Sequence, residues 1–170
     1  MDTVLDLRLL RLRPGDVRRE RVEVELDPFL LGQQRYDASP ASIAVELEIA
    51  QPSGATVFDL RAHVRLTGPC MRCLGPAAVE IDAYAREFHD PDAPPGDDLR
   101  SDYVVDDRLH VGTWTRDAVA LGIPEQILCR PDCAGLCPVC GRDLNVEPHE
   151  HPEREPDPRW AVLEELRERL

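Results

Sequence analysis

Apolar and polar side chains alternate through four stretches within the first 90 residues, namely residues 17–26, 42–50, 56–67 and 77–88. Successive side chains of a β-strand point to opposite faces of a sheet, so this pattern predicts strands with one face on a core and the other in water. Along 42–50, for example, the apolar side chains are those of Ile43, Val45, Leu47 and Ile49. Short turns join the last three stretches, so these neighbouring strands are expected to pair antiparallel.

The segments around these strands are less regular. Residues 4–13 alternate but slip in phase at Leu9-Leu10, and we interpret them as a strand with a bulge. Pro14-Gly15-Asp16 then predicts a turn. Residues 27–41 are expected to form a loop with at most short local structure. Residues 89–101 are rich in Pro, Gly and Asp and are expected to form a mobile loop.

Helical patterns are confined to the second half of the chain. A helix is predicted from Thr113 or Thr115, either of which can cap it, to about Leu121, because Gly and Pro follow. A second helix is predicted over residues 158–170. Asp157-Pro158 provides its N-cap and its first helical residue, and apolar side chains recur at helical spacing after them.

These elements predict an α+β protein in two parts. Residues 1–128 are expected to form a β-rich domain built on an antiparallel, barrel-like sheet, with one helix and a short strand near Tyr103–Val105 or Leu109–Val111. Residues 129–170 are expected to form a small zinc-knuckle module with the C-terminal helix packed on it. The chain has 170 residues and 42% apolar content, which suffices for one domain with a core and a small metal-stapled module.

The six cysteines lie in two short stretches. The first, Cys70-Met-Arg-Cys73, falls between two predicted strands and therefore at the tip of a hairpin. The second is Cys129-x3-Cys133-x3-Cys137-Pro-Val-Cys140-Gly141, followed by His149-Glu-His151. A Cys-x2-Cys turn places two thiolates on one tetrahedral ion, and structural zinc sites are usually built from two such pairs. The proline and glycine around Cys140 favour a tight turn that brings backbone amides to the sulfurs.

The spacing predicts two structural zinc sites. One would join Cys70 and Cys73 to Cys129 and Cys133, and the other would join Cys137 and Cys140 to His149 and His151. Short loops close the second site at small entropic cost, whereas the first joins distant segments. Other partitions stay open, including a single site made of Cys70, Cys73, Cys137 and Cys140, and so does an interpretation in which the histidines are only solvated. Three disulfides are disfavoured by the close pairing of the cysteines.

No catalytic residue is assigned. Closed, cysteine-rich ligand sets leave no open coordination position for zinc catalysis, and the chain has no phosphate-binding loop and no Ser/His/Asp pattern. We therefore expect no enzyme activity and no small-molecule substrate. A thiol or zinc redox function for Cys137 and Cys140 stays as an alternative of another class, although it would need a βαβ setting that the pattern does not predict.

The net charge narrows the choice of partner. It is −13, from 33 acidic and 20 basic residues. Such a chain is a poor general binder of polyanions and a plausible partner for a basic protein. The basic residues gather only between Arg8 and Arg21, on the first predicted hairpin, so direct RNA binding through that hairpin stays as an alternative. The chain has no apolar run of about 20 residues and begins with Met-Asp-Thr, so we expect a cytoplasmic protein that does not enter a membrane.

Three separate elements, in order, carry a resemblance to a known family. They are Cys70-Met-Arg-Cys73-Leu74, then Cys129 to Asn145 with its Cys-Pro-Val-Cys-Gly centre, then Asp157-Pro158-Arg159. In this respect the chain resembles the YceD family, the large ribosomal RNA subunit accumulation proteins. One departure is that His149-x-His151 stands where members with the full cysteine set commonly have Cys-x-Cys. Both residue types bind zinc, so the exchange makes this site less negative and retains its coordination chemistry.

The resemblance implies a role in accumulation of large-subunit ribosomal RNA and hence in ribosome biogenesis, without a chemical mechanism. Combined with the charge, it leads us to expect a non-enzymatic factor whose acidic, zinc-stapled surface binds a basic large-subunit ribosomal protein or a pre-ribosomal particle. Large-subunit ribosomal RNA itself is the alternative partner.

Overall fold

The computed structural model describes residues 3–94 and 96–152. The chain divides into two compact units, Met1–Cys133 and a second that begins at Ala134, and each is described by itself. Cys129 and Cys133 belong to the first unit, although the sequence placed the boundary after residue 128. The helix predicted over residues 158–170 lies outside the described residues. No described helix is both long and apolar enough to cross a membrane.

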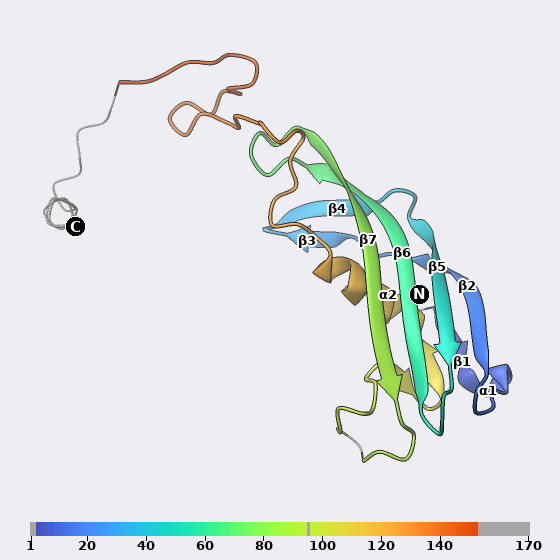
Figure 1. Ribbon diagram of the computed structural model, residues 1–170. Coiled ribbons are helices and arrows are strands. Elements are labelled where there is room, and N and C mark those ends of the chain that lie inside the picture. The colour runs from blue at the N-terminus through green and yellow to red at the C-terminus, as the bar shows by residue number, and fades with distance from the viewer. Residues whose placement is uncertain (1–2, 95, 153–170) are drawn as a thin grey trace, which may run out of the picture. The chain divides into compact units, whose positions relative to one another are not determined.

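The first unit is built on a six-stranded antiparallel sheet (Figure 1). Its strands are β2 (Val17–Glu25), β3 (Phe29–Leu31), β4 (Gln34–Ala38), β5 (Ser42–Ala50), β6 (Thr56–Pro69) and β7 (Pro76–His89). Their order is β2-β5-β6-β4-β3, and β7 pairs with the other side of β6 along its whole length. One end of β6 pairs with β5 and the other end with β4. The predicted α+β class and antiparallel pairing are confirmed.

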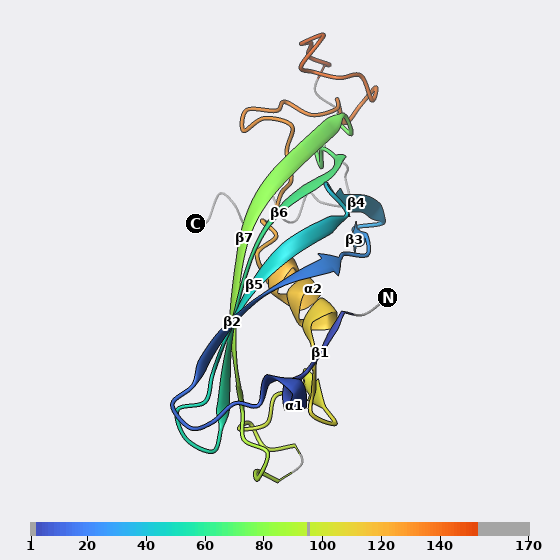
Figure 2. The same cartoon turned by 90° about the vertical axis from the view of Figure 1, so that its right-hand side faces the viewer.

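The sheet is open, so the barrel-like form expected from the sequence is wrong. A barrel closes only when its first and last strands pair. Among the described residues, however, β2 pairs only with β5, and β7 pairs only with β6. One face of the sheet is instead covered by helix α2 (Val111–Leu121), as Figure 2 shows. The apolar side chains of this helix therefore bury the face that closure would have enclosed.

A second, smaller antiparallel sheet has the order β1-β9-β8, formed by β1 (Val4–Asp6), β9 (Arg108–His110) and β8 (Val104–Val105). The predicted strand over residues 4–13 is therefore wrong beyond Asp6. The chain turns there into the short helix α1 (Leu7–Leu10), because the Asp6 carboxylate accepts the amide N–H of Arg8 at 3.1 Å. The phase slip at Leu9-Leu10 thus marks a helical turn and not a bulge.

Residues 27–41 hold the strands β3 and β4, where the sequence predicted mainly a loop. Phe29 and Tyr36 face each other across these strands, and both are buried. Each strand is too short to show a clear alternation, so tertiary burial decides the conformation.

The core lies between the sheet and α2. Trp114 of the helix contacts Phe58 of β6 edge to face, with ring centroids 6.5 Å apart. The helix ends at Leu121 as predicted, but His110 precedes it and no side chain caps its start. Thr115 lies inside the helix and is fully buried, so the threonine cap expected from the sequence is wrong.

Candidate metal centre

The first cysteine pair lies at the tip of the hairpin formed by β6 and β7, as the sequence predicted (Figure 1). The amide of Cys70 donates to the carbonyl of Gly75 at 2.6 Å, and the amide of Leu74 donates to the carbonyl of Cys70 at 3.0 Å. Leu74 has a φ of 60°, in the left-handed region that a tight reversal requires. The turn therefore curls around the Cys70 sulfur, which accepts the amide of Arg72 at 3.4 Å.

The segment after α2 brings the second pair to this tip. Met71 donates its amide to the carbonyl of Ile127 at 2.9 Å, and the amide of Ile127 points back to the Met71 sulfur. The Arg72 guanidinium donates to the carbonyl of Cys133 at 3.1 Å and to the side chain of Gln126 at 3.1 Å. These bonds attach the segment to the hairpin on both sides of Cys129.

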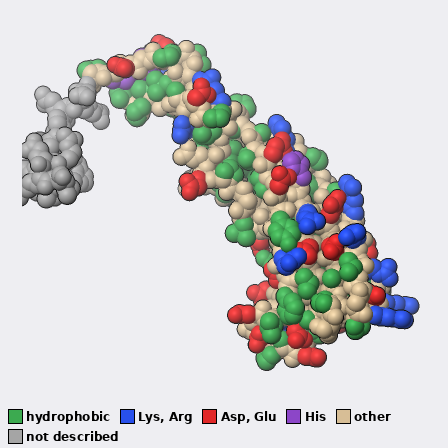
Figure 3. All heavy atoms as spheres, viewed as in Figure 1, with side chains coloured by type: hydrophobic (Ala, Val, Ile, Leu, Met, Phe, Trp, Pro, Cys, Tyr) green, Lys and Arg blue, Asp and Glu red, His purple; other side chains and the backbone are tan. Residues whose placement is uncertain are grey.

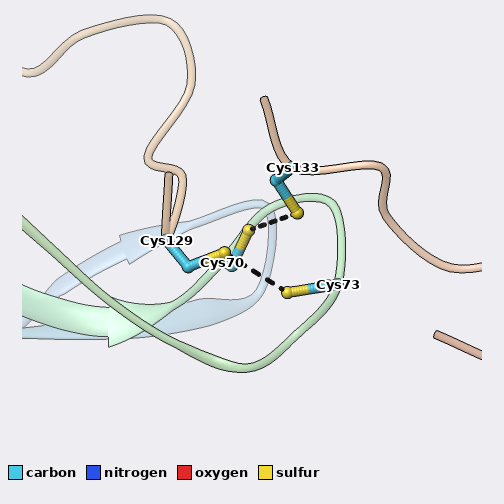
Figure 4. Close-up of side chains that lie close together, drawn as sticks. All are labelled: Cys70, Cys73, Cys129 and Cys133. Carbon is cyan, nitrogen blue, oxygen red and sulfur yellow. Dashed lines mark hydrogen bonds between the residues drawn. The ribbon is translucent and has the colours of Figure 1, made fainter. Parts of the chain in front are cut away.

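The four sulfurs of Cys70, Cys73, Cys129 and Cys133 converge (Figure 4), and all lie within 4.8 Å of one another. The Cys70 and Cys133 sulfurs are 3.8 Å apart, and those of Cys73 and Cys129 are 3.7 Å apart. A tetrahedral zinc ion with Zn–S bonds of about 2.3 Å separates its sulfurs by roughly 3.8 Å. The spacing therefore suits four thiolates around one ion, and all six cysteines of the chain are free of disulfides.

The thiols of this group differ in how readily they ionise. Burial opposes ionisation of Cys70, but the amides of Cys73, Arg72 and Cys129 outweigh it and lower the pKa of the Cys70 thiol to about 6. Desolvation and the neighbouring thiols raise the pKa of Cys129. Four thiolates this close repel one another, so a divalent cation is needed for all four to ionise together.

The second unit holds a second group, formed by Cys137, Cys140, His149 and His151, whose ligand atoms also lie within 4.8 Å of one another. Cys137 donates its amide to the carbonyl of Arg142 at 2.8 Å, and Gly141 donates to the carbonyl of Cys137 at 2.8 Å. Gly141 has a φ of 73°, which explains the glycine after the second cysteine. The Cys-Pro-Val-Cys-Gly sequence therefore forms the tight turn expected of it.

His149 is oriented for coordination by its other ring nitrogen. Its Nδ1 lies 2.8 Å from the carbonyl oxygen of Glu147, so Nδ1–H donates to this oxygen. The Nε2 lone pair then points toward Cys140, whose sulfur lies 3.1 Å away. The amide of Cys140 is the main cause that lowers the pKa of the Cys137 thiol to about 6. The hydrogen bond to Glu147 raises the pKa of His149.

All eight residues predicted as ligands lie in these two groups, and the division into metal sites stays a prediction. Within the second unit, Cys137 and Cys140 converge with the two histidines. The donor sets, four thiolates in one group and two thiolates with two imidazoles in the other, are those of closed structural zinc sites.

Sequence reasoning missed the residues that support the first group. Tyr36 is fully buried and donates its hydroxyl to the carbonyl of Pro69 at 2.8 Å, directly before Cys70. Its ring packs against Gly68, where a side chain would not fit. Arg72 ties the two cysteine pairs together. Gly68 carried a sequence signal, since it is a glycine shortly before a cysteine pair. Tyr36 carried none, because it lies in the segment that the sequence predicted to be a loop.

The arginines between Arg8 and Arg21 do not form an unbroken basic surface. Arg8 pairs with Asp6 at 3.0 Å and Arg19 pairs with Glu48 at 2.8 Å. Asp6, just before Arg8 in the chain, and Glu48, on the strand next to Arg19, thus offset part of the positive charge.

The fold and the two ligand groups define a class: an α+β protein with an open antiparallel sheet, whose long hairpin carries half of a four-cysteine group. A family model, described as large ribosomal RNA subunit accumulation protein YceD, matches residues 58–167. The chain belongs to the YceD family. This confirms the resemblance noted from the cysteine motifs.

Curated relatives agree with this assignment. An uncharacterized protein of Mycobacterium tuberculosis is 38% identical over 146 residues, which cover 75% of this chain and 70% of the relative. The protein YlbN of Bacillus subtilis is 30% identical over 113 residues, or 64% of each chain. A protein of Zea mays, named large ribosomal RNA subunit accumulation protein YCED homolog 1, chloroplastic, is 27% identical over 61% of this chain and 46% of its own. No solved structure gave a significant match.

Proposed function

We propose that this chain is a non-enzymatic ribosome biogenesis factor that supports accumulation of large-subunit ribosomal RNA in the cytoplasm. Membership of the YceD family is the observation that carries the proposal. The name of the maize relative, an accumulation protein for the large ribosomal RNA subunit, points the same way. In this proposal the direct partner is a basic large-subunit ribosomal protein or a pre-ribosomal particle that contains one.

The two ligand groups each hold a structural zinc ion in this proposal. Cysteine and histidine donors with tetrahedral spacing favour zinc over magnesium or calcium, which prefer oxygen. With all donors supplied by the chain, neither ion has an open position for a substrate or a water nucleophile. Zinc at Cys70, Cys73, Cys129 and Cys133 would staple the segment after α2 to the hairpin tip and so stiffen the surface around it.

Charge supports a basic protein over naked RNA as the partner. The chain carries −13, and in the arginine-rich strand β2 Arg19 pairs with Glu48 of the neighbouring strand. A surface of this kind attracts lysine- and arginine-rich segments and repels phosphate. No described residue stands in a parallel βαβ unit of the kind that surrounds a dithiol redox motif, and so a structural function for the cysteines is favoured.

The test replaces the chromosomal copy with a Cys70→Ser/Cys133→Ser variant and measures the ratio of large- to small-subunit ribosomal RNA. We expect the ratio to fall and precursor particles to accumulate, because the stapled surface is lost. The matched control is Leu121→Ser, which changes an 89% exposed side chain in the same unit. A normal ratio in cells that contain only the double variant, at wild-type protein level, would contradict the proposal.

Crosslinking in growing cells separates the two classes of partner. We expect ribosomal protein in the crosslinked fraction, and we expect neutralisation of Arg11, Arg13 and Arg18 to leave it unchanged. Recovery of RNA alone, lost on this neutralisation, would favour the arginine hairpin as an RNA site instead.

A further inference from the structure

The outer edge of β7 is a long strand edge with no partner among the described residues. The strand runs for 14 residues and pairs only with β6. Figure 1 shows it at the margin of the sheet, with no strand beyond it. An edge of this length presents a row of backbone donors and acceptors that another chain can use.

The register identifies which residues face outward. The amide of Cys70 donates to the carbonyl of Gly75, so these two residues form a hydrogen-bonded pair that closes the hairpin. Pro69 and Pro76, the next pair along the ladder, are not hydrogen-bonded to each other, because neither has an N–H to donate. Bonded and non-bonded pairs alternate in an antiparallel ladder. Odd-numbered residues from Ala77 to His89 therefore bond to β6, and the backbone groups of the even-numbered residues from 78 to 88 point away from the sheet.

A cavity of about 820 Å³ lies beside the last part of this edge. Arg86, Glu87 and Phe88 of β7 form one wall, and the opposite wall comes from residues 96–103 and the first turns of α2. Phe88 is 39% exposed and supplies an apolar contact next to the free backbone groups. An added strand would therefore lie between β7 and this second wall.

The cavity is acidic. Its lining includes five carboxylates and two arginines: Glu87, Asp97, Asp98, Asp102, Asp117, Arg86 and Arg100. Arg86 is already held by Asp59, with Nε 2.8 Å from the carboxylate, so it offsets little of the charge in the cavity. Figure 3 shows acidic side chains gathered at this end of the first unit. Burial, together with Asp117, Glu87 and Asp102, raises the pKa of Tyr103 to about 12, as expected in a negative field.

We propose that an extended, arginine- or lysine-rich segment of a ribosomal protein adds to the sheet as a strand beside β7, with its basic side chains in the acidic cavity. The proposal rests on the proposed function for the identity of the partner. The free ladder groups supply backbone pairing, and the carboxylates select for positive charge.

Charge argues against the other occupants of such an edge. A second copy of this chain would bring another net charge of −13 to the same place, and the two cavities would repel each other. RNA would place phosphates against the carboxylates of Asp98 and Asp102. A basic peptide strand meets neither penalty.

The probe is a nine-residue peptide of alternating arginine and valine, titrated into the full chain and followed by amide hydrogen exchange and fluorescence anisotropy. We expect slower exchange at the amides of the even-numbered residues 80–88. A version N-methylated on alternate residues cannot donate to the edge and should bind about tenfold more weakly. A peptide with glutamate in place of arginine should not bind.

Two variants of the chain, each with a matched control, test the two halves of the surface. Asp82→Pro removes an outward N–H without breaking the ladder to β6, and Asp82→Ala keeps that N–H with the same loss of charge. We expect the proline variant to bind the peptide about tenfold more weakly than the alanine variant, because it lacks one outward hydrogen-bond donor. The double variant Asp98→Asn/Asp102→Asn should weaken peptide binding severalfold and flatten its salt dependence. The control Glu25→Gln/Glu125→Gln makes the same change in net charge outside the cavity and should leave both the affinity and its salt dependence unchanged.

Several results would overturn the inference. Two concern the peptide: it does not bind, or it binds without protecting β7 from exchange. A third is equal affinity of the Asp82→Pro and Asp82→Ala variants for the peptide. The last two are a dimer of the free chain paired through β7, and protection of β7 by an RNA oligonucleotide instead of the peptide. Failure here is separable from failure of the proposed function. Loss of ribosomal RNA in the Cys70→Ser/Cys133→Ser strain tests the function without the peptide, and peptide binding to purified protein tests the surface without the ribosome.

Discussion

At the scale of single residues, the hairpin that carries Cys70 depends on a close approach between Gly68 and Tyr36. A Cβ at Gly68 would lie 2.8 Å from the backbone carbonyl oxygen of Arg35 and against the Tyr36 ring. Because the ring is fully buried and the carbonyl belongs to the backbone, neither can yield easily. The absence of a side chain at one position thus determines how the strand enters the cysteine turn.

Gly68→Ala should therefore destabilise the protein, by about 1–3 kcal/mol in the free energy of unfolding. Urea unfolding at neutral pH measures the change. Gly54→Ala, where an added Cβ meets nothing within 4 Å, is the matched control. Equal stability of the two variants would show that the packing of Tyr36 is not tight.

Asp59 is a partly buried carboxylate held by an ion pair. Its side chain is 15% exposed and accepts the Arg86 guanidinium at 2.8 Å and the Tyr84 hydroxyl at 2.7 Å. The Arg86 guanidinium is the main cause that lowers the pKa of Asp59 below its usual value. The stabilisation is therefore present above the unfolded pKa, near 4, and is lost as the pH falls through the lower folded pKa.

Asp59→Asn should cost about 1–2 kcal/mol at pH 7, and the difference from wild type should shrink as the solution is made acidic. Thermal or urea unfolding between pH 7 and pH 3 measures it, with Glu25→Gln as the control at an exposed position. A difference that stays constant over this range would exclude a contribution from the Asp59 carboxylate.

At the scale of elements, the first ligand group joins the tip of the β6–β7 hairpin to the segment that follows α2. The segment is already bound to the tip by Met71 and Arg72. A metal ion would add four strong bonds between parts of the chain about 60 residues apart, and closing so long a loop restricts the unfolded chain considerably. We therefore expect the order of the tip, and not that of the centre of the sheet, to depend on the ion.

Removal of zinc by a chelator should speed amide exchange at Cys70, Met71 and Ile127 by at least about tenfold. Val45 and Leu47, in the centre of the sheet, should change less, because their burial does not involve the site. Hydrogen exchange with and without the chelator measures this, and returning zinc should restore the slow rates. Equal amide exchange rates at the tip with and without the chelator would contradict a structural metal.

At the scale of the whole molecule, the chain consists of two units, each with its own ligand group. All four ligands of each group come from a single unit, so neither site needs the other unit to complete it. Four thiolates around zinc carry two negative charges, whereas two thiolates and two imidazoles carry none. With zinc bound, the histidines would therefore leave this group less negative than four cysteines would.

His149→Ala/His151→Ala should reduce bound zinc from two ions per chain to one and leave the main melting transition unchanged, because the first group is intact. Native mass spectrometry and calorimetry provide the two readouts. His63→Ala, at an exposed histidine outside both groups, should retain two ions. Loss of both ions in the double variant would mean that the two sites are coupled.

Local patterns determined much of this molecule in advance. The alternation along residues 17–26, 42–50, 56–67 and 77–88 predicted the four long strands, because the period of two in side-chain direction is a property of each strand by itself. The Cys-x2-Cys spacing likewise predicted a ligand pair at a hairpin tip, since a tight turn alone brings the two sulfurs together. The two ligand groups could be proposed because the two residues of each ligand pair are close in the sequence, and because only a few such pairs exist to be combined into sites of four.

Tertiary structure decided what no local pattern encodes. Burial of Phe29 and Tyr36 made strands of a segment that reads as a loop. The open sheet, with β7 at its edge, depends on which strands pair and on α2 covering one face, and these contacts join residues far apart in the chain. Hydrophobic alternation states which side of a strand is buried but not which strand lies beside it, so the free edge and its acidic cavity appear only once the chain has folded.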